Sequence, residues 1–281
     1  SNQLLPYALP IVTGFGSITN NFPATVKNTS WEFSVNSVNI KQADFNWSTN
    51  VNLTIPRNKL LAFPNLATSS YANSLVIGQP ITITKVYHAL GVDPATGLYT
   101  FSSTTDPSNP RYTVDNTAII NTAPKFYAGI SNTFSYKRFS LDFLFQYVKQ
   151  TGLNDFYRMS NPGLFNKNQF VSVLDRWQNP GDQTTFQQFS STNGSRNQFF
   201  AQSTSDAAYA DASYLRLKNF SLSWQVTPDW VKSMHLQNLR VYLQGQNLLT
   251  FTPYKGLDPE TLSVSSLPPL RIITAGIQVG L

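Results

Sequence analysis

The feature that most constrains the fold is a strict alternation of side-chain type between positions 139 and 147. Successive side chains of a β-strand point to opposite faces, so this pattern predicts a strand with one apolar face and one mixed, wetter face. The residues predicted to form the apolar face are Phe139, Leu141, Phe143, Phe145 and Tyr147.

The same alternation recurs along the chain in pairs of segments joined by short links. Residues 126–136 and 139–147 form one predicted hairpin, with a tight turn at Lys137 and Arg138. The other predicted strands cover residues 31–36, 45–55, 219–226, 239–251 and 271–281. With a further strand over residues 2–10, the pattern predicts about eight strands of roughly ten residues, the length that crosses a bilayer when tilted.

The composition matches a chain with one lipid-facing side and one wet side. Charged residues make up 12% of the chain and aromatic residues 14%, whereas soluble domains contain roughly 25% charged residues. The net charge of +6 is spread over single basic residues, which argues against nucleic-acid binding. No apolar run approaches the roughly 20 residues of a membrane helix.

Link lengths indicate how such strands would be oriented. Long links cover residues 57–124, 151–212 and 252–270, whereas short links cover residues 41–44, 137–138 and 227–237. Transmembrane β-barrels have long extracellular loops and short periplasmic turns. We therefore predict an all-β, antiparallel transmembrane barrel fold, with Trp47 and Trp224 joining the five residues above on the lipid-facing side. A soluble β-sandwich, with its apolar faces packed together, is the alternative.

Several separated blocks of the sequence resemble the SusC/RagA family of TonB-dependent outer-membrane transporters of Bacteroidetes. The resemblance covers essentially the whole chain, in order. The blocks include FYAGISNTFSYKRFSLDFLFQ, RWQNPGD, DASYLRLKNFSLSWQVTPDWV, LRVYLQGQNLLTFTPYKGLDPE and LPPLRIITAGIQVGL.

This resemblance implies a 22-stranded, plugged barrel in the Gram-negative outer membrane. It also implies energy coupling through TonB, pairing with a SusD-like surface lipoprotein, and import of oligosaccharides or peptides. The plug domain and the TonB box of the family have no counterpart in these residues. We therefore expect residues 1–281 to be the C-terminal part of the barrel domain of a longer transporter. A surface binding or adhesion module that conducts nothing is the alternative from another functional class.

The residues give no support to an enzyme. No G-x-S-x-G nucleophile motif is present, and the two histidines are far apart, so no catalytic residue or metal site is assigned. Loop carboxylates could coordinate Ca²⁺, although turn formation beside proline is the favoured interpretation. These carboxylates are Asp93, Asp106, Asp115, Asp258 and Glu260.

Neutral polar groups and aromatic platforms in the loops are the candidates for contacting a sugar or a peptide. We assign this role to Phe156, Tyr157, Arg158, Trp177 and Asn179. Packing of each side chain within the loops is the alternative.

Overall fold

A computed structural model gives the structure of this chain. It describes residues 3–9, 11–22, 24–154, 168–233, 235–263 and 266–280. The strands are β1 (Gln3–Ala8), β2 (Ser17–Phe22), β3 (Thr25–Lys41), β4 (Phe45–Ala62), β5 (Ile83–Val86), β6 (Ala89–Val92), β7 (Tyr99–Phe101), β8 (Ala118–Asn121), β9 (Phe126–Tyr136), β10 (Phe139–Lys149), β11 (Thr151–Leu153), β12 (Tyr209–Asp211), β13 (Tyr214–Gln225), β14 (Asn238–Phe251) and β15 (Ile272–Gly280). The α-helices are α1 (Tyr112–Asp115), α3 (Asn193–Ser203) and α4 (Pro228–Ser233), and short 3-10 turns cover Ile11–Thr13, Leu66–Thr68, Val171–Leu174 and Asp206–Ala208.

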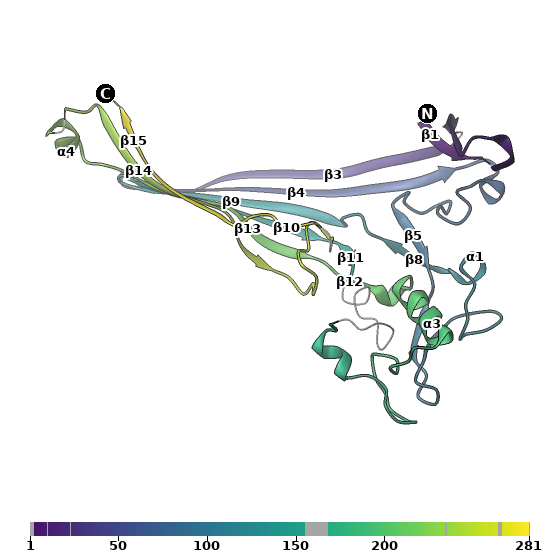
Figure 1. The fold of residues 1–281 in the computed structure, drawn as a ribbon. Coiled ribbons are helices and arrows are strands. Elements are labelled where there is room, and N and C mark those ends of the chain that lie inside the picture. The colour runs from purple at the N-terminus through teal and green to yellow at the C-terminus, as the bar shows by residue number, and fades with distance from the viewer. Residues whose placement is uncertain are drawn as a thin grey trace. The chain divides into compact units, whose positions relative to one another are not determined.

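Seven of the strands form one large sheet in the order β15-β14-β13-β10-β9-β4-β3 (Figure 1). The strands from β15 to β4 in this order pair antiparallel with their neighbours, which confirms the all-β, antiparallel class. The predicted strand at residues 2–10 is not part of this sheet, because β1 pairs with β2 in a separate two-stranded sheet. The large sheet therefore has seven strands among the described residues, where the sequence predicted about eight.

The chain divides into two compact units. The sheet unit comprises Ser30–Pro56, Pro124–Gln150 and Ala212–Leu281. The loop unit comprises Ser1–Thr29, Arg57–Ala123 and Thr151–Asp211.

The register of the sheet unit places the predicted apolar side chains on one face. Phe139 lies opposite Tyr136 and Trp224, and the alternation continues along β10 with Leu141 opposite Phe134 and Leu222. Trp47 of β4 also lies opposite Phe134. The aromatic rings of this face form stacked or tilted pairs, including Trp47 with Phe134 at 5.4 Å and Phe139 with Trp224 at 6.0 Å between ring centroids. All seven side chains predicted to face lipid therefore share one side of the sheet.

Much of this apolar face is exposed. Trp31 of β3 is 69% exposed and Ile277 of β15 is 67% exposed, and Phe139 lies half-exposed between them in the strand order. A β-sandwich would bury such side chains against a second sheet. The described residues of the sheet unit form no second sheet, so the sandwich alternative does not describe this structure.

The three short links lie at the same end of the sheet unit. The turn at Lys137 has a positive φ of 51°, and its backbone N–H donates to the carbonyl of Asp44 in the β3–β4 link at 2.7 Å. The backbone N–H of Gln225 donates to the carbonyl of Arg138 at 2.9 Å, immediately before the link that contains α4. These contacts confirm that the predicted short links cluster at one end.

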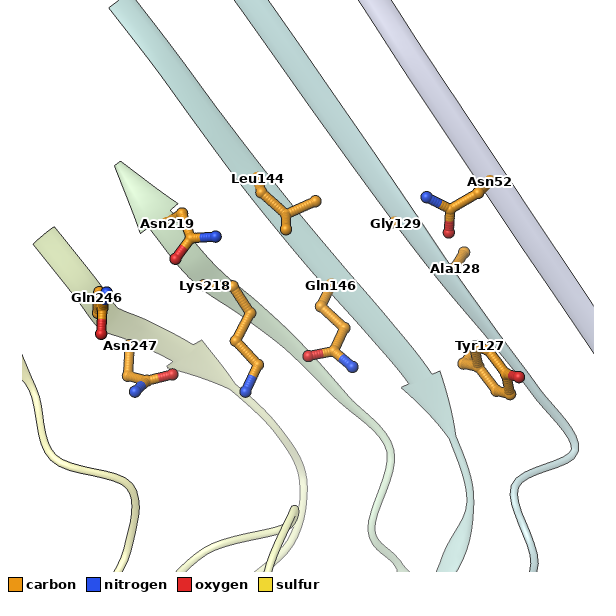
Figure 2. Close-up of a pocket in the computed structure, with 10 residues that line it drawn as sticks. All are labelled: Asn52, Tyr127, Ala128, Gly129, Leu144, Gln146, Lys218, Asn219, Gln246 and Asn247. Atoms are coloured by element: carbon orange, nitrogen blue, oxygen red, sulfur yellow. The ribbon is translucent and has the colours of Figure 1, made fainter. Parts of the chain in front are cut away.

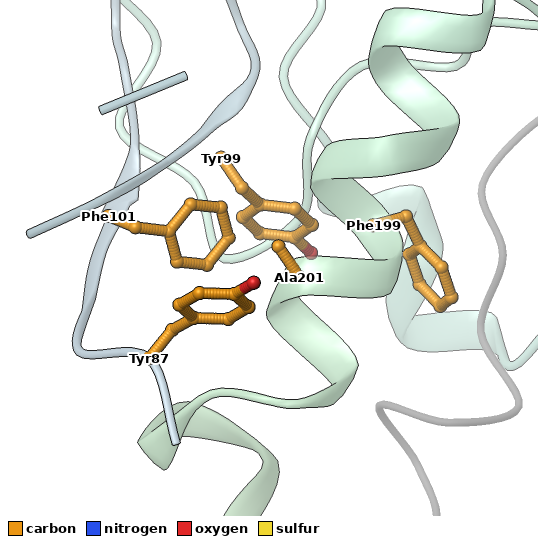
Figure 3. Close-up of a cluster of buried hydrophobic side chains, with 5 residues drawn as sticks. All are labelled: Tyr87, Tyr99, Phe101, Phe199 and Ala201. Carbon is orange, nitrogen blue, oxygen red and sulfur yellow. The ribbon is translucent and has the colours of Figure 1, made fainter. Parts of the chain in front are cut away.

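The loop unit has a core of its own, built from aromatic side chains of β7, α3 and the segment after β5. The buried members are Tyr87, Tyr99, Phe101, Phe199 and Ala201 (Figure 3). The rings of Tyr87 and Phe101 lie 5.8 Å apart between centroids. Among the described residues, no helix is both long enough and apolar enough to span a membrane.

A buried carboxylate fixes the loop that connects β7 to α1. Asp115 accepts hydrogen bonds from the backbone N–H groups of Arg111 at 2.8 Å and Thr104 at 3.1 Å, and from the hydroxyl of Ser103 at 3.0 Å. Donation from Arg111 and these other groups holds the pKa of the Asp115 carboxyl below its ordinary value of 3.8, although burial opposes that shift.

We predict from this arrangement that the loop loosens in acid. A depressed folded-state pKa contributes stability above the unfolded-state value, and that stability is lost as the pH falls through the folded-state pKa. The hydrogen-exchange protection factors of residues 103–115, which correct for the intrinsic pH dependence of exchange, should therefore fall on acidification below about pH 4. Asp115→Asn should exchange faster than wild type at neutral pH and lose most of the acid dependence. An unchanged pH profile in the variant would show that another group controls this loop.

Candidate functional site

The candidate site is a groove on the wet face of the sheet unit, which is the polar face opposite the apolar one. Its volume is about 510 Å³, and its lining comes from β4, β9, β10, β13 and β14 (Figure 2). The lining residues are Asn52, Tyr127, Ala128, Gly129, Leu144, Gln146, Lys218, Asn219, Gln246 and Asn247. Side-chain amides dominate, so the groove offers many neutral hydrogen-bond donors and acceptors.

Two neighbouring bulges increase the number of polar side chains in this groove. The pairing of β13 shifts register around Lys218 on both sides, so Lys218 and the adjacent Asn219 both line the groove. On β14, Gln246 and Asn247 are also consecutive lining residues, and Asn247 has a positive φ of 52°. A bulge redirects side chains that strict alternation would send to opposite faces. The bulges therefore concentrate cationic and amide groups at one place.

Gly129 allows a close cross-strand approach at the other side of the groove. A Cβ atom at this position would lie 2.9 Å from the side-chain nitrogen of Asn52. Glycine therefore leaves room for the Asn52 amide to lie across β9.

A buried ion-pair cluster lies beside the groove. Arg216 of β13 is 1% exposed, and its guanidinium contacts the carboxylates of Asp258 and Glu260. Its Nε donates to the hydroxyl of Thr250 at 3.0 Å. Glu260 also accepts from the ammonium of Lys218, at 2.8 and 3.0 Å to its two oxygens. The cluster fixes the segment after β14 to the sheet.

In this structure Asp258 and Glu260 bind basic side chains rather than presenting free carboxylates to a Ca²⁺ ion. Their oxygens contact two basic side chains, and Asp258 also accepts from the backbone N–H groups of Glu260 at 2.9 Å and Thr261 at 3.1 Å. Asp93 accepts from the backbone of Ala95 and the hydroxyl of Thr96, as an Asx turn does. Within the described residues, no three or more His, Cys, Asp or Glu side chains are grouped to hold a metal ion.

None of the five residues predicted to contact substrate lines the groove of the sheet unit among the described residues. Phe156, Tyr157 and Arg158 lie outside the described residues. Trp177 belongs to the loop unit, where its ring Nε1 donates to the carbonyl of Pro94 at 2.9 Å. The exposed Asn179 forms a turn in which its backbone N–H donates to Asp182 at 2.8 Å. A substrate role for these residues stays a prediction, and Trp177 has a structural partner in the loop.

Trp177 fastens two segments of the loop unit together. Gly97, at the turn between β6 and β7, has a φ of +70°, and a Cβ atom there would lie 2.3 Å from the Trp177 ring. The carbonyl of Gly97 accepts from the backbone N–H of Gln188 at 2.8 Å. The tryptophan therefore packs on a turn that only glycine leaves open.

We predict that Gly97→Ala opens this contact. Positive φ alone costs an ordinary residue about 1–2 kcal/mol, and the added methyl also collides with the indole. Limited proteolysis between residues 176 and 188 should become faster. Gly91→Ala is the matched control, because Gly91 also has a positive φ of 102° but a methyl added there would meet no atom within 4 Å. Equal protease sensitivity of the two variants would contradict a specific role for the indole contact.

The sequence did not identify Arg216, Lys218 or Asn247 as site residues. Arg216 lies between the apolar Leu215 and Leu217, and this alternation could have placed its side chain on the wet face. No local pattern indicated the two bulges or the return of Asp258 and Glu260 onto β13.

Several known proteins are similar to this chain in sequence or in fold. No family model matches the chain. The chain is 30% identical to "TonB-dependent receptor P26" of Formosa agariphila, over 99% of its own length and 31% of that protein. The chain is homologous to TonB-dependent receptors. It is also 29% identical to "TonB-dependent receptor P3" of the same organism, over 98% of this chain and 31% of that protein.

A third relative is "TonB-dependent receptor SusC" of Bacteroides thetaiotaomicron. The identity is 24%, over 95% of this chain and 27% of that protein. The structure of the "RagAB peptide transporter" superposes with a TM-score of 0.78 at 24% identity, over 98% of this chain and 32% of that chain. This chain thus spans about a third of the length of these proteins. The predicted SusC/RagA resemblance and the barrel-type fold are confirmed.

Proposed function

We propose that this chain forms part of the barrel wall of a TonB-dependent importer in the outer membrane of a Gram-negative bacterium of the Bacteroidetes. The observation that carries the proposal is a single antiparallel sheet with one exposed apolar face and one polar face. In a membrane barrel the apolar face contacts lipid and the polar face lines the interior.

Hydrogen bonds between polar side chains of the apolar face also support contact with lipid. Asn132 lies opposite Phe143 of that face, and its side-chain oxygen accepts from the indole N–H of Trp47 at 2.9 Å and the hydroxyl of Thr49 at 2.7 Å. Thr49 in turn accepts from the amide of Asn39 at 2.7 Å. Hydrocarbon offers no hydrogen-bond partners, so polar groups facing it must satisfy one another.

The names of the relatives mention TonB, and the SusC/RagA resemblance implies a surface lipoprotein. We infer energy coupling to TonB through parts of the receptor that these residues do not contain, and a SusD-like lipoprotein as a surface partner. The solute class is an oligosaccharide or a peptide, in keeping with the amide-rich groove of the wet face. The groove contributes binding and passage, and no covalent chemistry is required of it.

Uptake by the full-length receptor tests this function. A strain that lacks the receptor should lose import of labelled oligosaccharides or peptides, and the full-length gene should restore it only when TonB is present. Solute that stays bound to the cell surface without entering would favour the alternative of a binding or adhesion module. Uptake that persists without TonB would contradict the proposed energy coupling.

A further inference from the structure

The groove contains one charged side chain, and that side chain already holds a carboxylate. Among the described residues that line the groove, Lys218 is the only ionisable cation beside nine neutral or weakly polar neighbours. Its ammonium contacts both carboxylate oxygens of Glu260. The position where an anionic solute would bind Lys218 is thus occupied by a group of the protein itself.

Glu260 is the more accessible carboxylate of the cluster. Its side chain is 31% exposed, whereas the side chain of Asp258 is 8% exposed. Asp258 has further bonds from the backbone N–H groups of Glu260 and Thr261, and it contacts Arg216 independently of Glu260. If the Glu260 carboxylate turns away, the buried guanidinium of Arg216 therefore keeps a charged partner.

The charge balance decides what could replace Glu260. The cluster contains two cations, Arg216 and Lys218, and two carboxylates, Asp258 and Glu260. A neutral group in place of the Glu260 carboxylate would leave the Lys218 ammonium without a charged partner in a largely buried position, which is unfavourable. An incoming carboxylate would restore the balance and regain charge-assisted hydrogen bonds.

A second group in the groove lacks a partner. The side-chain oxygen of Gln146 is buried and accepts no hydrogen bond from any described residue. Buried acceptors of this kind are normally satisfied, so the Gln146 oxygen leaves an unmet hydrogen-bond requirement in the wall of the groove. Gln146 and Lys218 line the same groove (Figure 2).

We propose that Lys218 and the Nη1 group of Arg216 bind a carboxylate of the imported solute, and that Glu260 occupies this subsite when solute is absent. The proposal rests on the proposed importer function and names the solute chemistry. Free peptide C-termini and uronic acid sugars both carry such a carboxylate.

Titration calorimetry on the purified full-length receptor can test this subsite. The probes are acetyl-triglycine against its C-terminal amide, and trigalacturonate against maltotriose. Wild type should bind at least one acid more tightly than its neutral counterpart, and the pair that shows this preference identifies the source of the carboxylate. Glu260→Gln removes the competing carboxylate and should tighten binding of that acid by about tenfold.

Two further variants make the test specific. Lys218→Gln should abolish the preference for the acid, because the amide lacks the positive charge. Glu32→Gln is the matched control: it makes the same substitution on an exposed β3 residue outside the groove lining, and should behave as wild type. Variants that shift affinity in opposite directions cannot both be explained by loss of folding.

Equal binding of acid and neutral probe in both wild type and Glu260→Gln would overturn the subsite, and so would a complete absence of binding. Uptake measurements separate this result from the importer function. TonB-dependent uptake of neutral solutes without any acid preference would contradict the subsite alone. A calorimetric acid preference without uptake of any solute would contradict the importer function and leave the subsite supported.

Discussion

Phe143→Arg is expected to destabilise the assembled full-length receptor by ~2–4 kcal/mol if this position lies near the bilayer midplane. Phe143 is on the apolar face of β10, where its ring packs on Phe134 at 6.0 Å and Phe145 at 5.7 Å between centroids. The substitution replaces an apolar ring with a guanidinium that hydrocarbon cannot solvate. Urea unfolding from lipid vesicles would measure the loss.

Ser140→Arg is the matched control for the assignment of faces. Ser140 lies on the same strand but points to the wet face, where its hydroxyl donates to Asp142 at 3.4 Å. Asp142 also accepts from the hydroxyl of Thr133 at 2.7 Å, so an arginine nearby would find a carboxylate and water. We expect only a small change in unfolding free energy. Equal destabilisation by the two substitutions would refute the lipid-facing assignment of the odd-numbered residues of β10.

The long strands could be predicted from the sequence because alternation is a local property. Phe139, Leu141 and Phe143 specify a face without reference to any other part of the chain. A hairpin with a two-residue turn also fixes its own register, which is why the pairing of β9 with β10 follows from the sequence. The strand expected at residues 2–10 also exists, but its pairing with β2 depends on contacts that its own pattern does not specify.

The candidate site could be predicted only in part, because its chemistry depends on non-local contacts. Alternation predicted a wet face rich in amides, and the groove is on that face. The bulge at Lys218 interrupts the alternation that would have placed its side chain. Glu260 reaches Lys218 across 42 positions of sequence, and no local pattern encodes that return. Trp177 was chosen for its aromatic character, which serves equally well for packing on Gly97.

Arg216→Met should destabilise the receptor strongly because it leaves a buried carboxylate without its cation. Arg216 is almost completely buried and contacts both Asp258 and Glu260. Loss of one partner from a buried ion pair costs about 3–5 kcal/mol. We expect hydrogen exchange to accelerate most in residues 256–262, the segment that the cluster fixes to the sheet, and the midpoint of urea unfolding to fall.

Two comparisons show whether the lost charge pairing causes this effect. Arg271→Met makes the same substitution at an exposed arginine of the same unit, and exposed substitutions usually change stability by no more than about 0.5 kcal/mol. The double variant Arg216→Met with Asp258→Asn also removes the negative charge of Asp258, which Arg216→Met alone leaves without its cation. The amide oxygen of the new side chain can still accept from the N–H groups of Glu260 and Thr261. The double variant should therefore lose less stability than the sum of the two single variants. Simple additivity would mean that Arg216 contributes through packing of its side chain, and that the charges of the cluster do not hold the segment in place.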